Sequence, residues 1–102
     1  MAAGIGHALH ALELDYAVVQ LESIVDLKFR PGPPTRNYDD ALRADAAAFA
    51  AYYHALRKRG ILLAPSQNEV MFLSTEHTDA DVAETIAAAG ESLRELRAEG
   101  RL

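Results

Sequence analysis

The stretch that decides the fold runs from Tyr53 to Thr78 and reads Tyr-His-Ala-Leu-Arg-Lys-Arg-Gly-Ile-Leu-Leu-Ala-Pro-Ser-Gln-Asn-Glu-Val-Met-Phe-Leu-Ser-Thr-Glu-His-Thr. Three basic residues followed by Gly60 are typical of the C-terminal end of a helix. The apolar run at 61–64 predicts a short strand that Pro65 ends or places at an edge. Residues 69–74 predict a further strand. Helix, strand, turn and strand therefore follow one another in close order.

Thr78 opens the last predicted helix. Asp81 follows it three residues later, the spacing of a capping box. Gly90 is expected inside this helix on a face other than its apolar one, and residues 97–102 are expected to form a frayed tail. The apolar residues that recur at helical spacing are Val82, Ile86, Ala89, Leu93 and Leu96.

The N-terminal part of the chain predicts a helix followed by extended structure. Residues 4–14 carry apolar side chains at helical spacing. Residues 17–21 and 24–29 are rich in β-formers and predict two strands, or one strand broken near Glu22 and Ser23. In the second run, Val25, Leu27 and Phe29 alternate with Asp26 and Lys28, so that the two sets face opposite sides of a sheet.

A loop and a long helix are expected to complete the fold. Residues 30–34 contain three prolines, which a central strand does not accommodate. Asn37 and Asp39 are cap candidates for one long helix that Gly60 ends. The economical packing is a single α+β domain spanning residues 1–102, with a small, mostly antiparallel sheet of three to four strands covered on one face by about three helices.

Composition excludes several classes of function. The chain has 102 residues, a formal net charge of −5 and no cysteine. Disulfides and thiolate metal sites are therefore excluded, and a cytoplasmic location is expected. No basic face with aromatic residues indicates nucleic-acid binding. No signal peptide and no membrane-spanning run is expected either.

The histidines do not predict a metal centre. His7, His10 and Glu13 are spaced by threes on a helix, a spacing that drifts around the helix axis, so exposed helix residues are the better account. His54 and His77 are expected to be packed or surface residues. The sequence also contains no nucleophile elbow and no phosphate-binding glycine loop.

Several motifs, occurring in one order between Ala17 and Leu96, resemble the C-terminal small domain of glutamate-1-semialdehyde 2,1-aminomutases and related class III aminotransferases that depend on pyridoxal phosphate. The most specific of them is the Pro-Ser-Gln-x-Glu turn. The matching residues are Asn37-Tyr38-Asp39-Asp40-Ala41, Arg43-Ala44-Asp45, Phe49, Tyr53-His54, Gly60, Ala64-Pro65-Ser66-Gln67 with Glu69, and Ser74 with His77-Thr78-Asp79.

The resemblance implies a substrate-binding role for Glu69, with Ser66 beside it. In the family this glutamate faces the active-site cleft and pairs with an arginine near the N-terminus of the full enzyme. The alternative is an ordinary turn glutamate exposed at the start of a strand. A cofactor lysine is also required, and the only lysines here are Lys28 and Lys58, neither of which is flanked by a cofactor cradle. Pyridoxal phosphate is therefore expected only in a complex with a large-domain polypeptide.

Two features depart from the family pattern. Glu22 stands where the family has the glycine of a Gly-Ser-Met-Phe turn, which is costly if that turn needs a positive φ. Asn68 stands where the family has an aromatic residue. Two hypotheses follow: the small-domain polypeptide of a split or truncated enzyme, or a non-catalytic binding or oligomerisation module descended from that domain. The second predicts exposed apolar patches and a homo-oligomer when the chain is alone.

Overall fold

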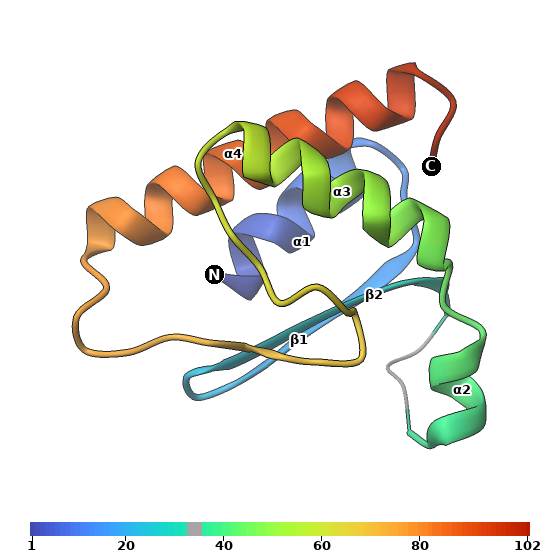
Figure 1. Cartoon of the computed structure of the whole chain (residues 1–102), viewed down its shortest axis with the longest axis horizontal. Coiled ribbons are helices and arrows are strands. Elements are labelled where there is room, and N and C mark those ends of the chain that lie inside the picture. Colours follow the sequence, from blue (N-terminus) through green and yellow to red (C-terminus); the bar gives the residue numbers. More distant parts are fainter. Residues whose placement is uncertain (33–35) are drawn as a thin grey trace.

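The structure of the chain, a computed structural model, describes residues 1–32 and 36–102. The described elements are α1 (Ala2–Ala11), β1 (Tyr16–Leu21), β2 (Ile24–Pro31), α2 (Tyr38–Leu42), α3 (Ala46–Lys58), β3 (Met71–Phe72) and α4 (Asp79–Ala98). The strands form one antiparallel sheet in the order β1-β2-β3. The helices α1, α3 and α4 lie on one side of the sheet, with α4 packed against the other two (Figure 1). The predicted α+β class is confirmed.

The core lies between β2 and the helices. Val25, Leu27 and Phe29 point inward, as their alternation predicts, and each is buried. The ring of Phe29 occupies the centre of an aromatic cluster. Its centroid lies 5.1 Å from that of Tyr52 on α3 and 5.2 Å from that of Tyr16 on β1. Such tilted pairs add to the stabilisation that burial alone provides.

A two-residue turn joins β1 and β2, so the run is two strands rather than one broken strand. Leu21 pairs with Ile24, and Glu22 and Ser23 form the turn between them. Glu22 adopts a φ of +52°. This is the first central position of the turn, where hairpins with one left-handed residue prefer glycine. The strain expected for a glutamate at this position is therefore present.

The prediction of one long helix after the proline-rich segment is wrong, because two helices form. Asn37 caps only the short α2, by accepting a hydrogen bond from the backbone N–H of Asp40 at 2.9 Å. Asp45 caps α3 by accepting from the N–H of Ala48. The N–H of Asp45 itself donates to the carbonyl of Phe29 at 2.8 Å. This bond holds Asp45 in an extended conformation and interrupts the helix.

The predicted strand at 61–64 is also wrong, and the one at 69–74 shrinks to the two residues of β3. The reason is that β3 pairs only with Ile24 and Val25, while the side chain of Gln67, in the turn that precedes β3, occupies the next stretch of the β2 edge. The predicted loop at 30–34 begins later, because β2 continues to Pro31. Pro31 pairs with Tyr16 of β1 beyond a shift in the register of the two strands. Pro33 and Pro34 lie outside the described residues.

The helix ends agree with the local signals, with one correction. Gly60 has a φ of +85° and closes α3 at the expected position. The capping box of Thr78 and Asp81 is present at the start of α4. Gly90, by contrast, is buried against α1, where a Cβ would lie 3.7 Å from that of Ala8. The prediction of a separate face for Gly90 is therefore wrong.

The two ends of the chain are each tied to a helix. The first helix spans 2–11 rather than the predicted 4–14, and Glu13 follows it with a φ of +57°. After α4, the N–H of Gly100 donates to the carbonyl of Arg97 and the N–H of Arg101 to that of Leu96. These two bonds form a Schellman closure. Fraying of residues 97–102 stays a prediction, for which hydrogen exchange is the measure.

Replacing Glu22 by glycine is expected to raise the free energy of unfolding by up to about 1 kcal/mol, because glycine removes the left-handed strain at a small entropic cost. The matched control is Ser23→Gly, whose native φ is not positive. That substitution is expected to lower stability by about 0.5 kcal/mol. Urea denaturation of both variants is the measurement, and equal effects would contradict the strain.

The capping box also predicts a dependence of stability on pH. The backbone hydrogen bond from Thr78 is the main cause that lowers the pKa of the Asp81 carboxyl below its ordinary value of 3.8. A lowered folded-state pKa stabilises the protein above the unfolded pKa, and this contribution is lost as pH falls through the folded pKa. Between about pH 5 and pH 2, unfolding midpoints of the wild-type chain should therefore fall more than those of Asp81→Asn.

Candidate functional site

The turn at 65–69 is fixed to the sheet by the side chain and the backbone of one residue. Gln67 is 8 % exposed, and its side-chain Oε1 accepts a hydrogen bond from the backbone N–H of Phe29 at 3.2 Å. Its own carbonyl accepts a hydrogen bond from the Nζ of Lys28. Gln67 thus takes the place that a strand residue would occupy along this edge of β2. The turn is held to the sheet although the segment directly before it, residues 61–64, is not a strand.

Lys28 supplies the second tie. Its side chain points to the outer face of the sheet, but it is only 7 % exposed because the turn covers it. Its Nζ lies 2.6 Å from an Oδ1 of Asp26. A buried ammonium group requires such partners, since removing its charge from water is costly. The amine of Lys28 is therefore committed to holding the turn.

The structure brings the two predicted site residues together on this turn. The backbone N–H of Glu69 donates to the carbonyl of Ser66 at 3.1 Å. The hydroxyl of Ser66 accepts from the N–H of Asn68 at 3.1 Å, which leaves its own proton available to another acceptor. The side chain of Glu69 is exposed, and it makes no ion pair with the residues of 1–32 and 36–102.

Hollows adjoin the turn on two sides. One, of about 370 Å³, lies between the turn and α3 and has Ser66, Tyr53 and His54 among its lining residues. The other has only about 20 Å³ of free volume, and Leu27, Phe29, Ser66 and Glu69 are among its lining residues. Ser66 therefore borders both hollows. Glu69 borders only the narrow one.

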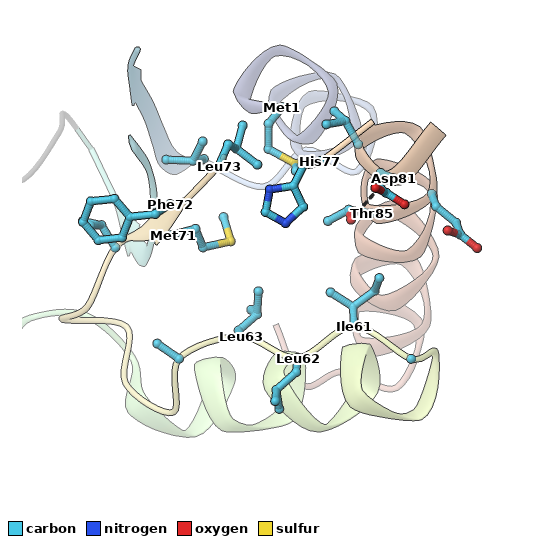
Figure 2. A pocket seen from close by; sticks show the side chains of 16 residues that line it. Met1, Ile61, Leu62, Leu63, Met71, Phe72, Leu73, His77, Asp81 and Thr85 are labelled. Carbon is cyan, nitrogen blue, oxygen red and sulfur yellow. Dashed lines mark hydrogen bonds between the residues drawn. The ribbon is translucent and has the colours of Figure 1, made fainter. Parts of the chain in front are cut away.

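A larger groove, of about 540 Å³, lies between residues 61–64, residues 70–73 and the start of α4. Figure 2 shows the ring of His77 and the side chains of Met1 and Met71 around it. The Nδ1 of His77 accepts a hydrogen bond from the N–H of Ser74 at 2.9 Å. The carboxylate of Asp81 belongs to the capping box. Local turns thus use these polar groups, and most of the other lining residues have apolar side chains.

The other histidines form no site. His7 and His10 are exposed on α1, and no group of three metal-ligating side chains comes together in the described ranges. His54 is exposed and stacks edge-on against Tyr53, with ring centroids 5.3 Å apart. Among the residues that the structure describes, no helix has the length and apolar character needed to cross a membrane.

Comparison with known proteins shows which proteins the chain is similar to. The chain is 38 % identical over 94 residues to glutamate-1-semialdehyde 2,1-aminomutase of Clostridium novyi. It is 37 % identical over 97 residues to the enzyme of the same name from Methanothermobacter thermautotrophicus. These matches cover 92 % and 95 % of this chain. The chain belongs to the family of the small C-terminal domain of glutamate-1-semialdehyde 2,1-aminomutases.

The chain spans only about a fifth of the length of these relatives, with 22 % of the Clostridium novyi enzyme covered. A solved structure described as a transaminase with PLP bound has the same fold, with a TM-score of 0.75 and 30 % identity. The match covers 99 % of this chain and 22 % of that one. No family model matches the chain. The aminotransferase-like small-domain fold expected from the motifs is thus confirmed.

The residues that hold the turn were not predicted. Alternation places Asp26 and Lys28 on the outer face of the sheet, which the structure confirms for their strand positions. It does not reveal that Lys28 is buried, because the covering turn lies 39 residues away in sequence. Gln67 carries no signal of its own beyond its place in the Pro-Ser-Gln-x-Glu motif.

Truncating Gln67 to alanine is expected to destabilise the chain by about 1–3 kcal/mol, because the buried N–H of Phe29 loses its acceptor. Asn68→Ala is the matched control, since this neighbouring amide side chain is exposed. It is expected to change stability by less than about 0.5 kcal/mol. Denaturant unfolding and hydrogen exchange at Phe29 are the measurements. Unchanged exchange of that amide in Gln67→Ala would rule out the tie.

Proposed function

We propose that this chain acts as the small-domain polypeptide of an enzyme resembling glutamate-1-semialdehyde aminomutase or an aminotransferase. It has no cofactor lysine of its own and needs a large-domain partner for any transamination. The observation that carries the proposal is the turn at 65–69. Buried contacts from Lys28, Phe29 and Gln67 fix its backbone, while the carboxylate of Glu69 is exposed and free to bind.

Glu69, with Ser66 beside it, would contribute to substrate binding. A fixed backbone orients the Glu69 carboxylate at little entropic cost on binding. An arginine of the partner is the suitable counterpart, because a guanidinium pairs with a carboxylate through two parallel hydrogen bonds. The free hydroxyl proton of Ser66 suits an acceptor on the substrate. No catalytic residue is assigned to this chain.

The residues of this chain do not fit pyridoxal phosphate on their own. When bound to an enzyme, the cofactor serves as an electron sink and is held through a lysine. The amine of Lys28 is buried and bonded to Asp26 and Gln67. Lys58 is exposed at the C-terminal end of α3. We therefore assign the cofactor to the large-domain partner, and expect the chain alone to be inactive.

The second candidate function is a non-catalytic binding or oligomerisation module descended from this domain. The strained φ of Glu22, where the family has glycine, favours it, because a turn under selection for shape should have kept the glycine. Six large apolar residues are more than a third exposed, which suits self-association of the free chain. For either function we propose a cytoplasmic location, since the chain has no cysteine. We propose neither nucleic-acid nor membrane partners.

The proposed function is tested by co-expressing the chain with the large domain of the Clostridium novyi relative. A stable complex with the visible absorbance of bound pyridoxal phosphate and with transaminase activity is expected. Glu69→Ala should lower kcat/KM by about 30-fold or more, because truncation leaves the partner's cation unpaired in the cleft. Glu76→Ala, at another exposed glutamate in the segment between β3 and α4, is the control and should have no effect.

If the chain forms stable homo-oligomers and does not bind the large domain, the split-enzyme proposal is contradicted. That result supports the binding module instead. A complex whose activity survives Glu69→Ala would remove the substrate-binding role of Glu69 while leaving the partnership intact.

A further inference from the structure

The outer face of the sheet carries a row of exposed apolar side chains. Leu21 on β1 pairs with Ile24 on β2, and Ile24 pairs in turn with Phe72 on β3. Directly paired residues point to the same side of a sheet, so these three lie next to one another across all three strands. Val19 lies on the same face, two residues along β1. We call Val19, Leu21, Ile24 and Phe72 the outer row.

The outer row is accessible over most of its length. Leu21 is 70 % exposed and Phe72 is 67 % exposed, although both stand in strands. The helices α1, α3 and α4 all lie on the other side of the sheet, so none of them covers the row (Figure 1). The turn at 65–69 covers only the neighbouring part of the outer face, at Lys28.

An apolar row of this kind is a feature that soluble domains avoid unless a partner covers it. Single exposed apolar residues are ordinary, but a contiguous set marks an interaction site. The row also reaches both edge strands, where exposed apolar residues invite aggregation. The fold therefore leaves one face of its sheet in need of cover.

We propose that the outer row is the surface on which the large domain of an aminotransferase-type enzyme docks. This rests on the proposed function and names the contact that makes the partnership. In the solved transaminase with PLP bound, the same fold occupies only 22 % of the chain, so it occurs there together with a much larger remainder. The row lies on the face of the sheet opposite to α1, α3 and α4.

The charges beside the row indicate the chemistry of the partner surface. Asp26 and Lys28 adjoin the row on the same face, and they neutralise one another at 2.6 Å. The surface that docks here is therefore apolar, and the association should depend little on salt. The turn at 65–69 adjoins the same face, because the carbonyl of Gln67 accepts a hydrogen bond from Lys28.

The test compares substitutions of two leucines that differ only in their place. Leu21→Lys charges the outer row, and Leu62→Lys charges an equally exposed leucine, 74 % exposed, in the segment at 61–64 outside the sheet. Each tagged variant is co-expressed with the large domain of the Clostridium novyi relative. The dissociation constant of the purified complex is then measured by mass photometry. Circular dichroism of the chain alone checks that each variant folds.

A dissociation constant raised about tenfold or more by Leu21→Lys, and by less than about threefold by Leu62→Lys, supports the docking surface. Phe72→Lys should act as Leu21→Lys does. A complex that is unaffected by both row substitutions overturns the docking surface but leaves the proposed function standing. If the wild-type chain forms no complex, the proposed function fails, and with it the choice of partner.

Sedimentation of the free chain separates the remaining occupant, a second copy of itself. Self-association that Leu21→Lys abolishes, in a chain that does not bind the large domain, would overturn the proposal in favour of a homodimer interface. A monomeric wild-type chain that binds the large domain supports it. Binding that persists at about 1 M salt, where charge pairs are screened, supports the apolar character of the contact.

Discussion

Both backbone polar groups of Phe29 are bonded to segments that lie far along the chain, and the rest of the structure depends on this arrangement. Its N–H donates to the side chain of Gln67, and its carbonyl accepts from the N–H of Asp45. The ring of the same residue is fully buried among the aromatic residues of β1 and α3. One position of β2 thus fixes the sheet, the start of α3 and the Pro-Ser-Gln turn relative to one another.

This arrangement explains how a domain of 102 residues can hold the turn at 65–69 in one conformation without a strand leading directly into it. The turn receives its order from a glutamine side chain and a buried lysine rather than from a β-ladder. The cost of burying the lysine is offset by its carboxylate and carbonyl partners. The carboxylate of Glu69 stays outside this network, so it is available to a partner or a substrate.

The two faces of the sheet differ in how far they are covered. The inner face packs against α1 and α3, while the outer row lies on the face opposite to α1, α3 and α4. A fold that forms a fifth of its relatives' length and leaves one apolar face open is suited to completion by another domain. The proposed site and the proposed docking surface adjoin one another, because Lys28 on the outer face is hydrogen-bonded to the turn.

The sequence by itself determined the features that local physics controls. The alternation of apolar residues in β2 predicts which side chains point inward. Gly60 and Thr78 mark the end of α3 and the start of α4. The sequence also indicates that Glu22 is strained if its turn needs a positive φ, which the structure shows that it does. Each of these depends on neighbours within a few residues. The family motifs also placed Ser66 and Glu69 on one turn, although their roles stay predictions.

Only the tertiary structure decided the rest. Contacts made by Phe29 and Gln67, which lie 38 residues apart, account for the helix break at Asp45, the shortness of β3 and the burial of Lys28. No local pattern encodes such contacts. Either a further strand residue or the side chain of Gln67 can bond to the edge of β2, and which of the two does so is decided only when the chain has folded. The outer row likewise exists only through the register that aligns three strands.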